Sequence, residues 1–185
     1  AVFDQRGCVS PRSIYVESSG YTTPEIFAEC LASALELVEH DLPSGNLELE
    51  EQASLHQIRG TAELIAASGS GAKINHGGRA SWTVIFDPQS ELGCCHVGRV
   101  VRVVPIRGLS DLAKRLGQDK EHLQSVGVAG VGAELERLAE ELGRLGVTRV
   151  TEFSRMPFPP SPWHHDGGSP LRDLVRWVDL ERIDG

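Results

Sequence analysis

The segment VGRVVRVVPI, residues 97–106, decides the fold because it is almost continuously apolar. Runs of this kind are typical of strands that are buried on both faces of a sheet, as in parallel sheets covered by helices. Residues 125–131 form a second short run of the same type. The sequence therefore predicts an α/β protein, in which helices cover a sheet on both sides.

Strand-like and helix-like segments alternate on either side of this segment. Residues 13–17, 81–86 and 147–153 are the other three expected strands. The expected helices cover residues 24–41, 47–67, 109–116, 133–145 and 171–178. Thr23 and Pro24 suit the N-cap and first position of the first helix, and Cys30 falls on its apolar stripe, so we expect that thiol in the core. Five strands with intervening helices predict a three-layer α/β domain with a mostly parallel sheet.

Composition narrows the class of protein. A chain of 185 residues is expected to form one domain. It opens with Ala1, so we expect a piece of a longer protein. No basic segment followed by an apolar run and small residues opens it, so we expect no secretory signal. The 26 acidic and 18 basic residues give a net charge of −8, which argues against a nucleic-acid surface. No apolar run approaches the ~18 residues of a membrane span. Four cysteines, two of them adjacent at Cys94 and Cys95, favour free thiols and the reducing cytoplasm.

Cys8 is the first candidate for chemistry. It lies in the polar segment FDQRGCVSPR, residues 3–12, just before the strand expected at 13–17. The neighbouring Arg6 and backbone N–H groups would stabilise a thiolate, which is the nucleophilic form of cysteine. An inert, partly buried cysteine is the alternative, because unpaired cysteine is among the most buried residue types. The local sequence leaves both interpretations open.

A second distinctive segment, MPFPPSPWHHDGG at residues 156–168, is followed by LRDLVRWVDLE at 171–181. Together with residues 3–12, it resembles the LuxC-like acyl-CoA reductases, a branch of the aldehyde dehydrogenase superfamily. The resemblance implies an aldehyde dehydrogenase catalytic-domain-like fold for residues 1–185. It also implies that these residues are the C-terminal part of a longer protein, with a nicotinamide-binding domain upstream.

The resemblance implies NADPH-dependent reduction of a fatty acyl thioester, carried by coenzyme A or an acyl carrier, to the aldehyde. Cys8 would form the thioester intermediate, and the upstream domain would hold most of the NADPH, so residues 1–185 alone are expected to be inactive. Enzymes that supply the acyl group are implied partners, and a homo-oligomer is a further expectation. Two alternatives stay open: another reductase of the superfamily, such as a glutamyl-phosphate reductase, and a non-catalytic binding or oligomerisation module.

The resemblance also places Trp163 and His164 beside the acyl chain, with His165 as the weaker candidate. Alternatively, these histidines only hydrogen-bond their own loop. The superfamily has a ribose-binding glutamate that residues 95–99 lack, which is a departure from its pattern.

Three further polar or glycine-rich groups were considered as metal, phosphate or dinucleotide sites. Cys94, Cys95 and His96 fit no ordinary zinc spacing, so we expect no metal site. Residues 75–79, NHGGR, are interpreted as a solvent-exposed loop, with a phosphate contact as the alternative. The glycines at 127, 130 and 132 have the wrong spacing for a dinucleotide fingerprint and are interpreted as a strand-to-helix turn.

Overall fold

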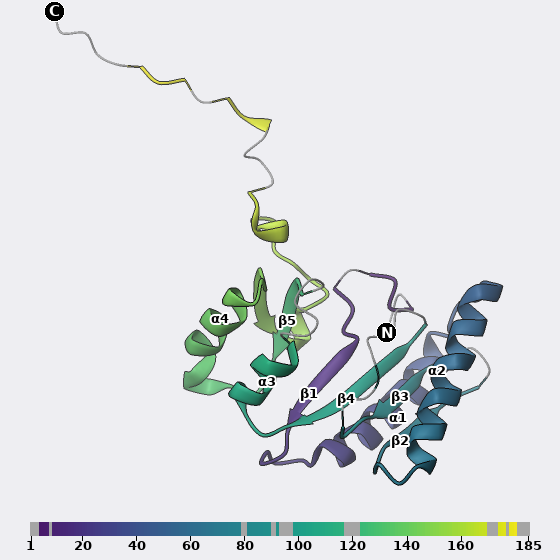
Figure 1. Ribbon diagram of the computed structural model, residues 1–185. Helices are drawn as coiled ribbons and strands as arrows, with labels where there is room; N and C mark the ends of the chain where they lie inside the picture. The colour runs from purple at the N-terminus through teal and green to yellow at the C-terminus, as the bar shows by residue number, and fades with distance from the viewer. Residues whose placement is uncertain are drawn as a thin grey trace, which may run out of the picture. The chain divides into compact units, whose positions relative to one another are not determined.

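The computed structural model describes residues 4–7, 9–78, 81–89, 92, 98–116, 123–169, 174–176 and 178–180. The chain forms two compact units, residues 1–115 and residues 116–185, and each is described by itself. Figure 1 shows the course of the chain from purple at the N-terminus to yellow at the C-terminus.

A four-stranded sheet in the order β1-β4-β3-β2 forms the first unit. Its strands are β1 (Ser13–Glu17), β2 (Lys73–His76), β3 (Thr83–Phe86) and β4 (Val100–Ile106). β4 pairs in parallel with both β1 and β3, whereas β2 pairs antiparallel with β3 at the edge. The predicted segment 97–106 thus supplies a strand that is paired in parallel on both sides, and four of its valines are almost fully buried.

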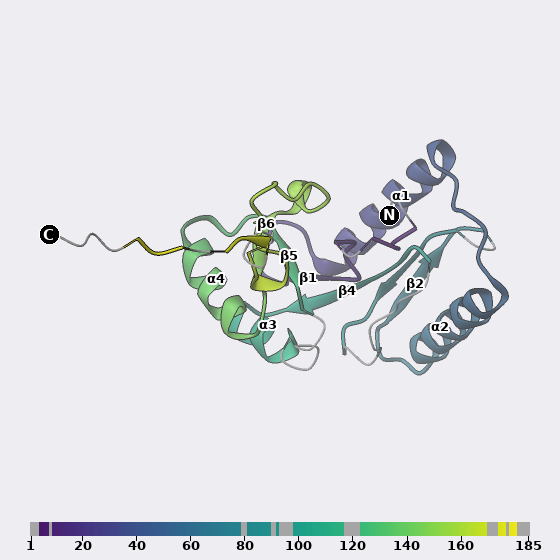
Figure 2. The same cartoon turned by 90° about the horizontal axis from the view of Figure 1, so that it is seen from above.

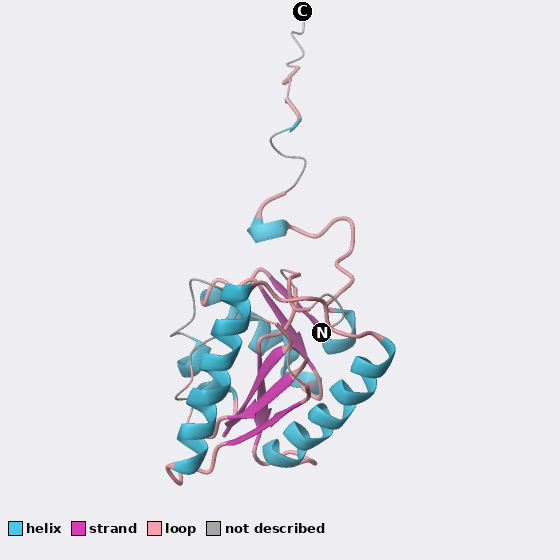
Figure 3. Ribbon diagram, turned by 90° about the vertical axis from the view of Figure 1, so that its right-hand side faces the viewer, coloured by secondary structure: helices cyan, strands magenta, loops and turns pink. Residues whose placement is uncertain are grey.

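Helices cover both faces of this sheet, as Figures 2 and 3 show. The helices of the unit are α1 (Pro24–Asp41), α2 (Leu49–Ala67) and α3 (Leu109–Leu116). Successive residues of a strand point to opposite faces; accordingly, Val84 of β3 packs with α1 and Ile85 packs with α2. The three-layer, mostly parallel α/β architecture predicted from the sequence is therefore confirmed.

The buried face of α1 differs from the predicted stripe. Cys30 is exposed, so its predicted core position is wrong. Apart from Pro24 at its first position, the buried positions are Ala28, Ala32 and Leu35, which lie on one helix face and form a cluster with Trp82. The indole ring needs volume opposite the helix, and two alanines provide it, which gives a packing reason for this orientation.

The second unit is built around two parallel strands, β5 (Ser125–Val128) and β6 (Arg149–Glu152), joined by α4 (Leu135–Arg144). Leu138 and Leu142 form the buried side of α4. Gly146 has a φ of 100°, and the N–H of Val147 donates to the carbonyl of Leu142 at 3.1 Å. A glycine with positive φ thus ends the helix that was expected at 133–145.

Three predictions about local structure are wrong. The five expected strands were assigned to one sheet, but β5 and β6 form a two-stranded sheet of their own. Asn75 and His76, expected in a loop, belong to β2, whose backbone is satisfied by pairing with β3. Residues 171–173 and 177 of the expected helix 171–178 lie outside the described residues; Leu174 is in a 3₁₀ turn, and residues 175, 176 and 178 are not helical. Leu174 and Val178 are 79% and 86% exposed, and a short helix without a packed face has little support.

No helix among the described residues is both long enough and apolar enough to span a membrane.

Candidate active site

The segment that carries Cys8 runs along the first unit and enters β1. Cys8 itself lies outside the described residues, but residues 4–7 and 9–12 on either side are described. The N–H of Ser10 donates to the carbonyl of Gly7 at 3.0 Å. The carbonyl of Arg12 accepts from the N–H of Arg102 at 3.0 Å, next to the pairing of β1 with β4. The segment on the C-terminal side of Cys8 is therefore fixed directly to the sheet.

Two consecutive residues before Cys8 have left-handed backbone conformations. Asp4 has a φ of 51° and Gln5 a φ of 57°, values that residues with a side chain seldom adopt. Gln5 is only 3% exposed, and its Nε2 donates to the carbonyl of Pro11 at 2.6 Å. This bond joins the two sides of the segment that contains Cys8. Backbone strain of this kind persists where the surrounding contacts determine it, and it is frequent at functional sites.

Asp4 holds the other end of this segment through its carboxylate. Its Oδ1 accepts from Arg99 Nε at 2.8 Å, and its Oδ2 accepts from the N–H of Gly45 at 3.0 Å. Arg99 also donates from its Nη1 to Glu39 Oε2 of α1 at 2.9 Å. Three stretches that are distant in the sequence are thereby joined at one buried guanidinium. No local pattern in the sequence indicates this network.

Arg6, the cation expected to stabilise a Cys8 thiolate, has a carboxylate partner in the structure. Its Nη2 lies 3.0 Å from Glu51 Oε2 in the first turn of α2, and both side chains are partly exposed. Surface pairs of this kind contribute at most about 1 kcal/mol. The pair anchors the segment to α2, while the effect of Arg6 on the thiol stays a prediction.

The second unit brings Trp163 together with His165. Their ring centroids are 4.8 Å apart in an edge-on arrangement. His165 Nδ1 lies 2.9 Å from Asp166 Oδ2, and Asp166 Oδ1 accepts from Gln124 Nε2 at 2.6 Å. His164, which the sequence analysis favoured over His165, is exposed. The role of Trp163 and His164 beside an acyl chain stays a prediction, because the structure describes only the protein side of these contacts.

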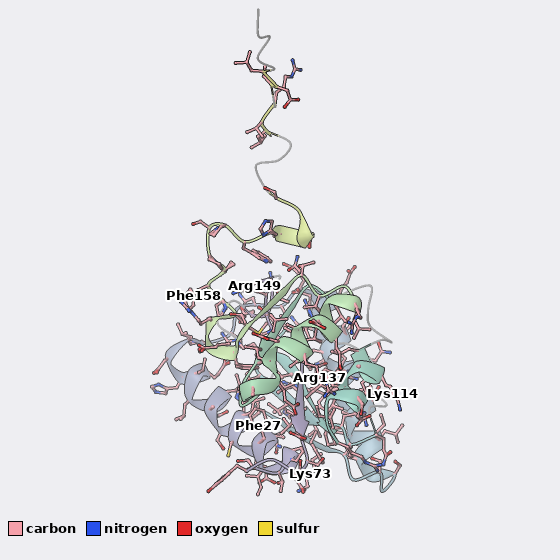
Figure 4. All side chains as sticks on the ribbon, turned by 90° about the vertical axis from the view of Figure 1, so that its left-hand side faces the viewer. Phe27, Lys73, Lys114, Arg137, Arg149 and Phe158 are labelled. Carbon is pink, nitrogen blue, oxygen red and sulfur yellow. The ribbon has the colours of Figure 1, made fainter. Side chains whose placement is uncertain are left out.

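Arg149, which the sequence analysis did not single out, supports this loop. Its guanidinium lies 5.5 Å from the centre of the Trp163 ring and donates to the carbonyls of Met156 and Arg155 at 2.9 Å each. The side chain is only 8% exposed and is labelled in Figure 4. A charged residue within the expected strand 147–153 is the one signal in the sequence that could have drawn attention to it.

The remaining groups singled out in the sequence are the cysteine and histidine cluster, the 75–79 segment and the glycines after residue 126. Cys94, Cys95, His96 and Arg79 lie outside the described residues. Within the described ranges, no cluster of three or more His, Cys, Asp or Glu side chains is arranged to hold a metal ion. Gly127 lies in β5, where a Cβ atom would come within 2.7 Å of Met156 Cγ. This glycine therefore allows close packing against a methionine.

Comparison with known proteins gives consistent results. A sequence model described as acyl-CoA reductase (LuxC) matches residues 1–177. Long-chain acyl-protein thioester reductases of Aliivibrio fischeri and Photobacterium phosphoreum are 26% and 23% identical over 180 residues, which is 97% of this chain and 35% of each relative. The crystal structure of apo betaine aldehyde dehydrogenase from Staphylococcus aureus has a TM-score of 0.58 at 17% identity, covering 88% of this chain and 35% of that one. The chain thus spans about a third of the length of the relatives it matches.

Proposed function

Because the chain belongs to the LuxC family of acyl-CoA reductases, which matches residues 1–177, we propose that it carries the nucleophile of an enzyme that reduces fatty acyl thioesters to aldehydes. The curated relatives are named for long-chain acyl-protein thioesters, so acyl groups on coenzyme A or on a protein thiol are the proposed substrates. The observation that carries the proposal is the constrained segment around Cys8, where strained residues precede the thiol.

Cys8 is the proposed nucleophile. Its thiolate attacks the thioester carbonyl carbon, the bond to the carrier sulfur breaks, and the carrier leaves as a thiolate that takes up a proton. The product is an acyl group held on Cys8 as a new thioester, so this exchange involves no change of oxidation state. Cysteine suits the step because its thiolate is accessible near neutral pH and is strongly nucleophilic. An oxyanion forms during the exchange, and the backbone N–H of Cys8 is our proposed donor.

The glycines in and after β5 lack the spacing of a dinucleotide fingerprint. The strand-to-helix turn after β5 contains Gly130 and Gly132, but Gly127 at its start packs against Met156, where a dinucleotide-binding turn would leave the backbone open to a pyrophosphate. We therefore propose that the further chain of the full-length protein, upstream of residues 1–185, holds NADPH. When bound, NADPH supplies the hydride that converts the acyl group to the aldehyde.

Trp163 and His164 are proposed to contact the acyl chain, and enzymes that deliver acyl groups are proposed partners. The motifs of the family support this assignment, and the packing of Trp163 between Arg149 and His165 gives the indole a fixed position. We further propose a cytoplasmic location, which would keep the thiols reduced, and assembly as a homo-oligomer.

The experiment that tests the nucleophile is the intact mass of the full-length protein after incubation with a fatty acyl-CoA and no NADPH. We expect a gain of one acyl group, removed by hydroxylamine, that is absent in Cys8→Ala. Cys30→Ala is the matched control, because Cys30 is an exposed thiol on α1 and its loss should leave the adduct unchanged. No adduct at any chain length would disprove the proposal. Acylation by an acyl phosphate alone would favour the glutamyl-phosphate reductase class.

A further inference from the structure

Arg99 is a buried cation with two acidic partners from different parts of the first unit. Its side chain is 2% exposed and lies immediately before β4. The Nε contacts Asp4 at 2.8 Å, and the Nη1 contacts Glu39 at 2.9 Å. The two carboxylates are themselves about three-quarters buried. A buried guanidinium is costly unless it is fully paired, so this arrangement depends on all three side chains being present.

The two acidic residues are held from their other sides as well. Asp4 Oδ2 accepts from the N–H of Gly45, and a Cβ atom at position 45 would lie only 3.0 Å from that oxygen. Glu39 Oε1 accepts from both the N–H and the Oγ of Ser44, each at 2.9 Å. Residues 44–45 and Glu39, near the end of α1, thus hold the Arg99–Asp4 pair in place through hydrogen bonds.

The pair fixes the backbone at the start of the segment that carries Cys8. Asp4 and Gln5 are both left-handed, a backbone conformation that costs free energy in residues with a side chain. The bonds to Arg99 and Gly45 offset that cost on the Asp4 side, and the bond from Gln5 to Pro11 holds the far side of the segment. Cys8 therefore lies, in sequence, within a span that is held at both ends.

We propose that Arg99 is a positioning residue for the acyl transfer to Cys8. Through Asp4 it holds the backbone of the Cys8 segment in the conformation in which the thiolate meets the acyl carbonyl. This inference rests on the proposed function, because it assumes that Cys8 accepts the acyl group. Arginine is required because its planar fork serves two carboxylates in different directions, whereas lysine offers one point charge.

Two variants distinguish a role of the network in positioning the Cys8 segment from a role that acts only through its charges. Arg99→Met removes a positive charge, and Asp4→Asn removes a negative charge. If the network acted only through its charges on the Cys8 thiol, the two variants would shift the pH dependence of acylation in opposite directions. Both would then reach the maximal rate of the wild type at high pH. If it acts by positioning, both lower the maximal rate, because both release the Asp4 backbone.

The test is the single-turnover rate of acylation by a fatty acyl-CoA without NADPH, measured by intact mass on the full-length protein between pH 6 and pH 10. We expect Arg99→Met and Asp4→Asn each to lower the high-pH plateau about 10- to 100-fold, the range that a displacement near 1 Å produces. Arg99→Lys should recover only part of that loss. Arg59→Met is the control, since Arg59 is another buried arginine of the same unit that contacts the turn before β3; its plateau should equal that of the wild type.

Gly45→Ala keeps every charge and displaces the Asp4 carboxylate. It therefore tests the positioning role even if an Arg99 variant does not fold. We expect a several-fold lower plateau, with Gly60→Ala unchanged because the space around that α2 position is open. Plateaus equal to those of the controls in Gly45→Ala and Asp4→Asn would overturn the positioning role. A wild-type protein that is never acylated would instead overturn the proposed function itself, and the inference with it.

Discussion

Gly127 shows how one missing side chain permits the packing of the second unit. A Cβ atom at this position in β5 would lie 2.7 Å from Met156 Cγ and 3.2 Å from the backbone Cα of Phe153. The methionine is buried at 7% exposure, and the backbone atom in reach belongs to Phe153, directly after β6. Overpacking in a filled interior costs about 1 to 3 kcal/mol. We therefore predict that Gly127→Ala lowers the free energy of unfolding by that amount, measured by urea denaturation.

Gly143→Ala is the control for this prediction. Gly143 lies in α4 of the same unit, and a Cβ atom there would meet nothing within 4 Å. Alanine is the better helix former, by up to about 1 kcal/mol, so this variant should be as stable as the wild type or more so. Equal stability of Gly127→Ala and Gly143→Ala would show that Met156 can move away without cost.

The connection between α2 and the sheet depends on Arg59. Its guanidinium donates to Thr83 Oγ1 at 2.9 Å and to the carbonyls of Gly78, Ser81 and Trp82 at 3.3 to 3.4 Å. Burial lowers the pKa of Arg59, yet arginine stays charged throughout the physiological range. We predict that Arg59→Met destabilises the protein by roughly 2 to 4 kcal/mol, because buried acceptors without a donor cost about 1 to 3 kcal/mol each.

The measurement for Arg59 is chemical denaturation of the variant against the wild type. Arg59→Lys should be intermediate, since the ammonium can reach only part of the donor set. A change below about 0.5 kcal/mol, typical of surface substitutions, would mean that water replaces the guanidinium at these carbonyls.

The start of α3 gives a pH-dependent prediction. The N–H of Arg107 donates to Asp111 Oδ2 at 3.2 Å. This bond, followed by the charge of Arg115, lowers the pKa of Asp111. A carboxylate whose pKa is lower in the folded state stabilises the protein above its unfolded pKa, and this stabilisation is lost as the pH falls through the folded pKa. Asp111→Asn should therefore have a lower urea midpoint than the wild type at pH 7.

The difference between Asp111→Asn and the wild type should shrink once the pH falls below about 4, where unfolded aspartate begins to take up protons. It should vanish when Asp111 is protonated in the folded state as well. A constant difference between pH 7 and pH 3 would show that the side-chain amide is worse for a reason other than charge.

How far the sequence determines these elements depends on the range of the contacts involved. The apolar run at β4 and the Thr23-Pro24 start of α1 are local signals, and both are confirmed. β2 has the polar sequence KINH and is a strand only because β3 lies beside it. The exposed Cys30 belongs to the same class of error, because the rotation of α1 is set by Trp82, about fifty residues away in sequence.

The candidate site divides in the same way. Cys8 could be identified because a short motif resembles a known family, and the Trp163-His164 segment likewise. The Asp4–Arg99–Glu39 network could not, because its members are separated by 60 and 95 positions and charged residues elsewhere in the chain look no different in one sequence. Left-handed Asp4 and Gln5 were equally hidden, since neither residue type requires that conformation.

At the scale of the whole molecule, our proposal separates two chemical steps. Cys8 belongs to this chain, whereas the chain spans only about a third of its curated relatives. Our proposal assigns acyl transfer to Cys8 of this chain and NADPH binding to further chain. The two steps have different requirements, because transfer of the acyl group needs only a positioned thiolate, while reduction needs a hydride donor held against the thioester.

We therefore predict that residues 1–185 alone show no NADPH oxidation with a fatty acyl-CoA, while the full-length protein does. Absorbance at the NADPH band measures this directly, and circular dichroism of the fragment with a cooperative thermal transition serves as the control for folding. The comparison is informative because a folded, inactive fragment locates the missing step outside these residues. Sustained NADPH oxidation by the folded fragment would contradict the proposal that NADPH binds outside residues 1–185, since the cofactor would then have to bind within this chain.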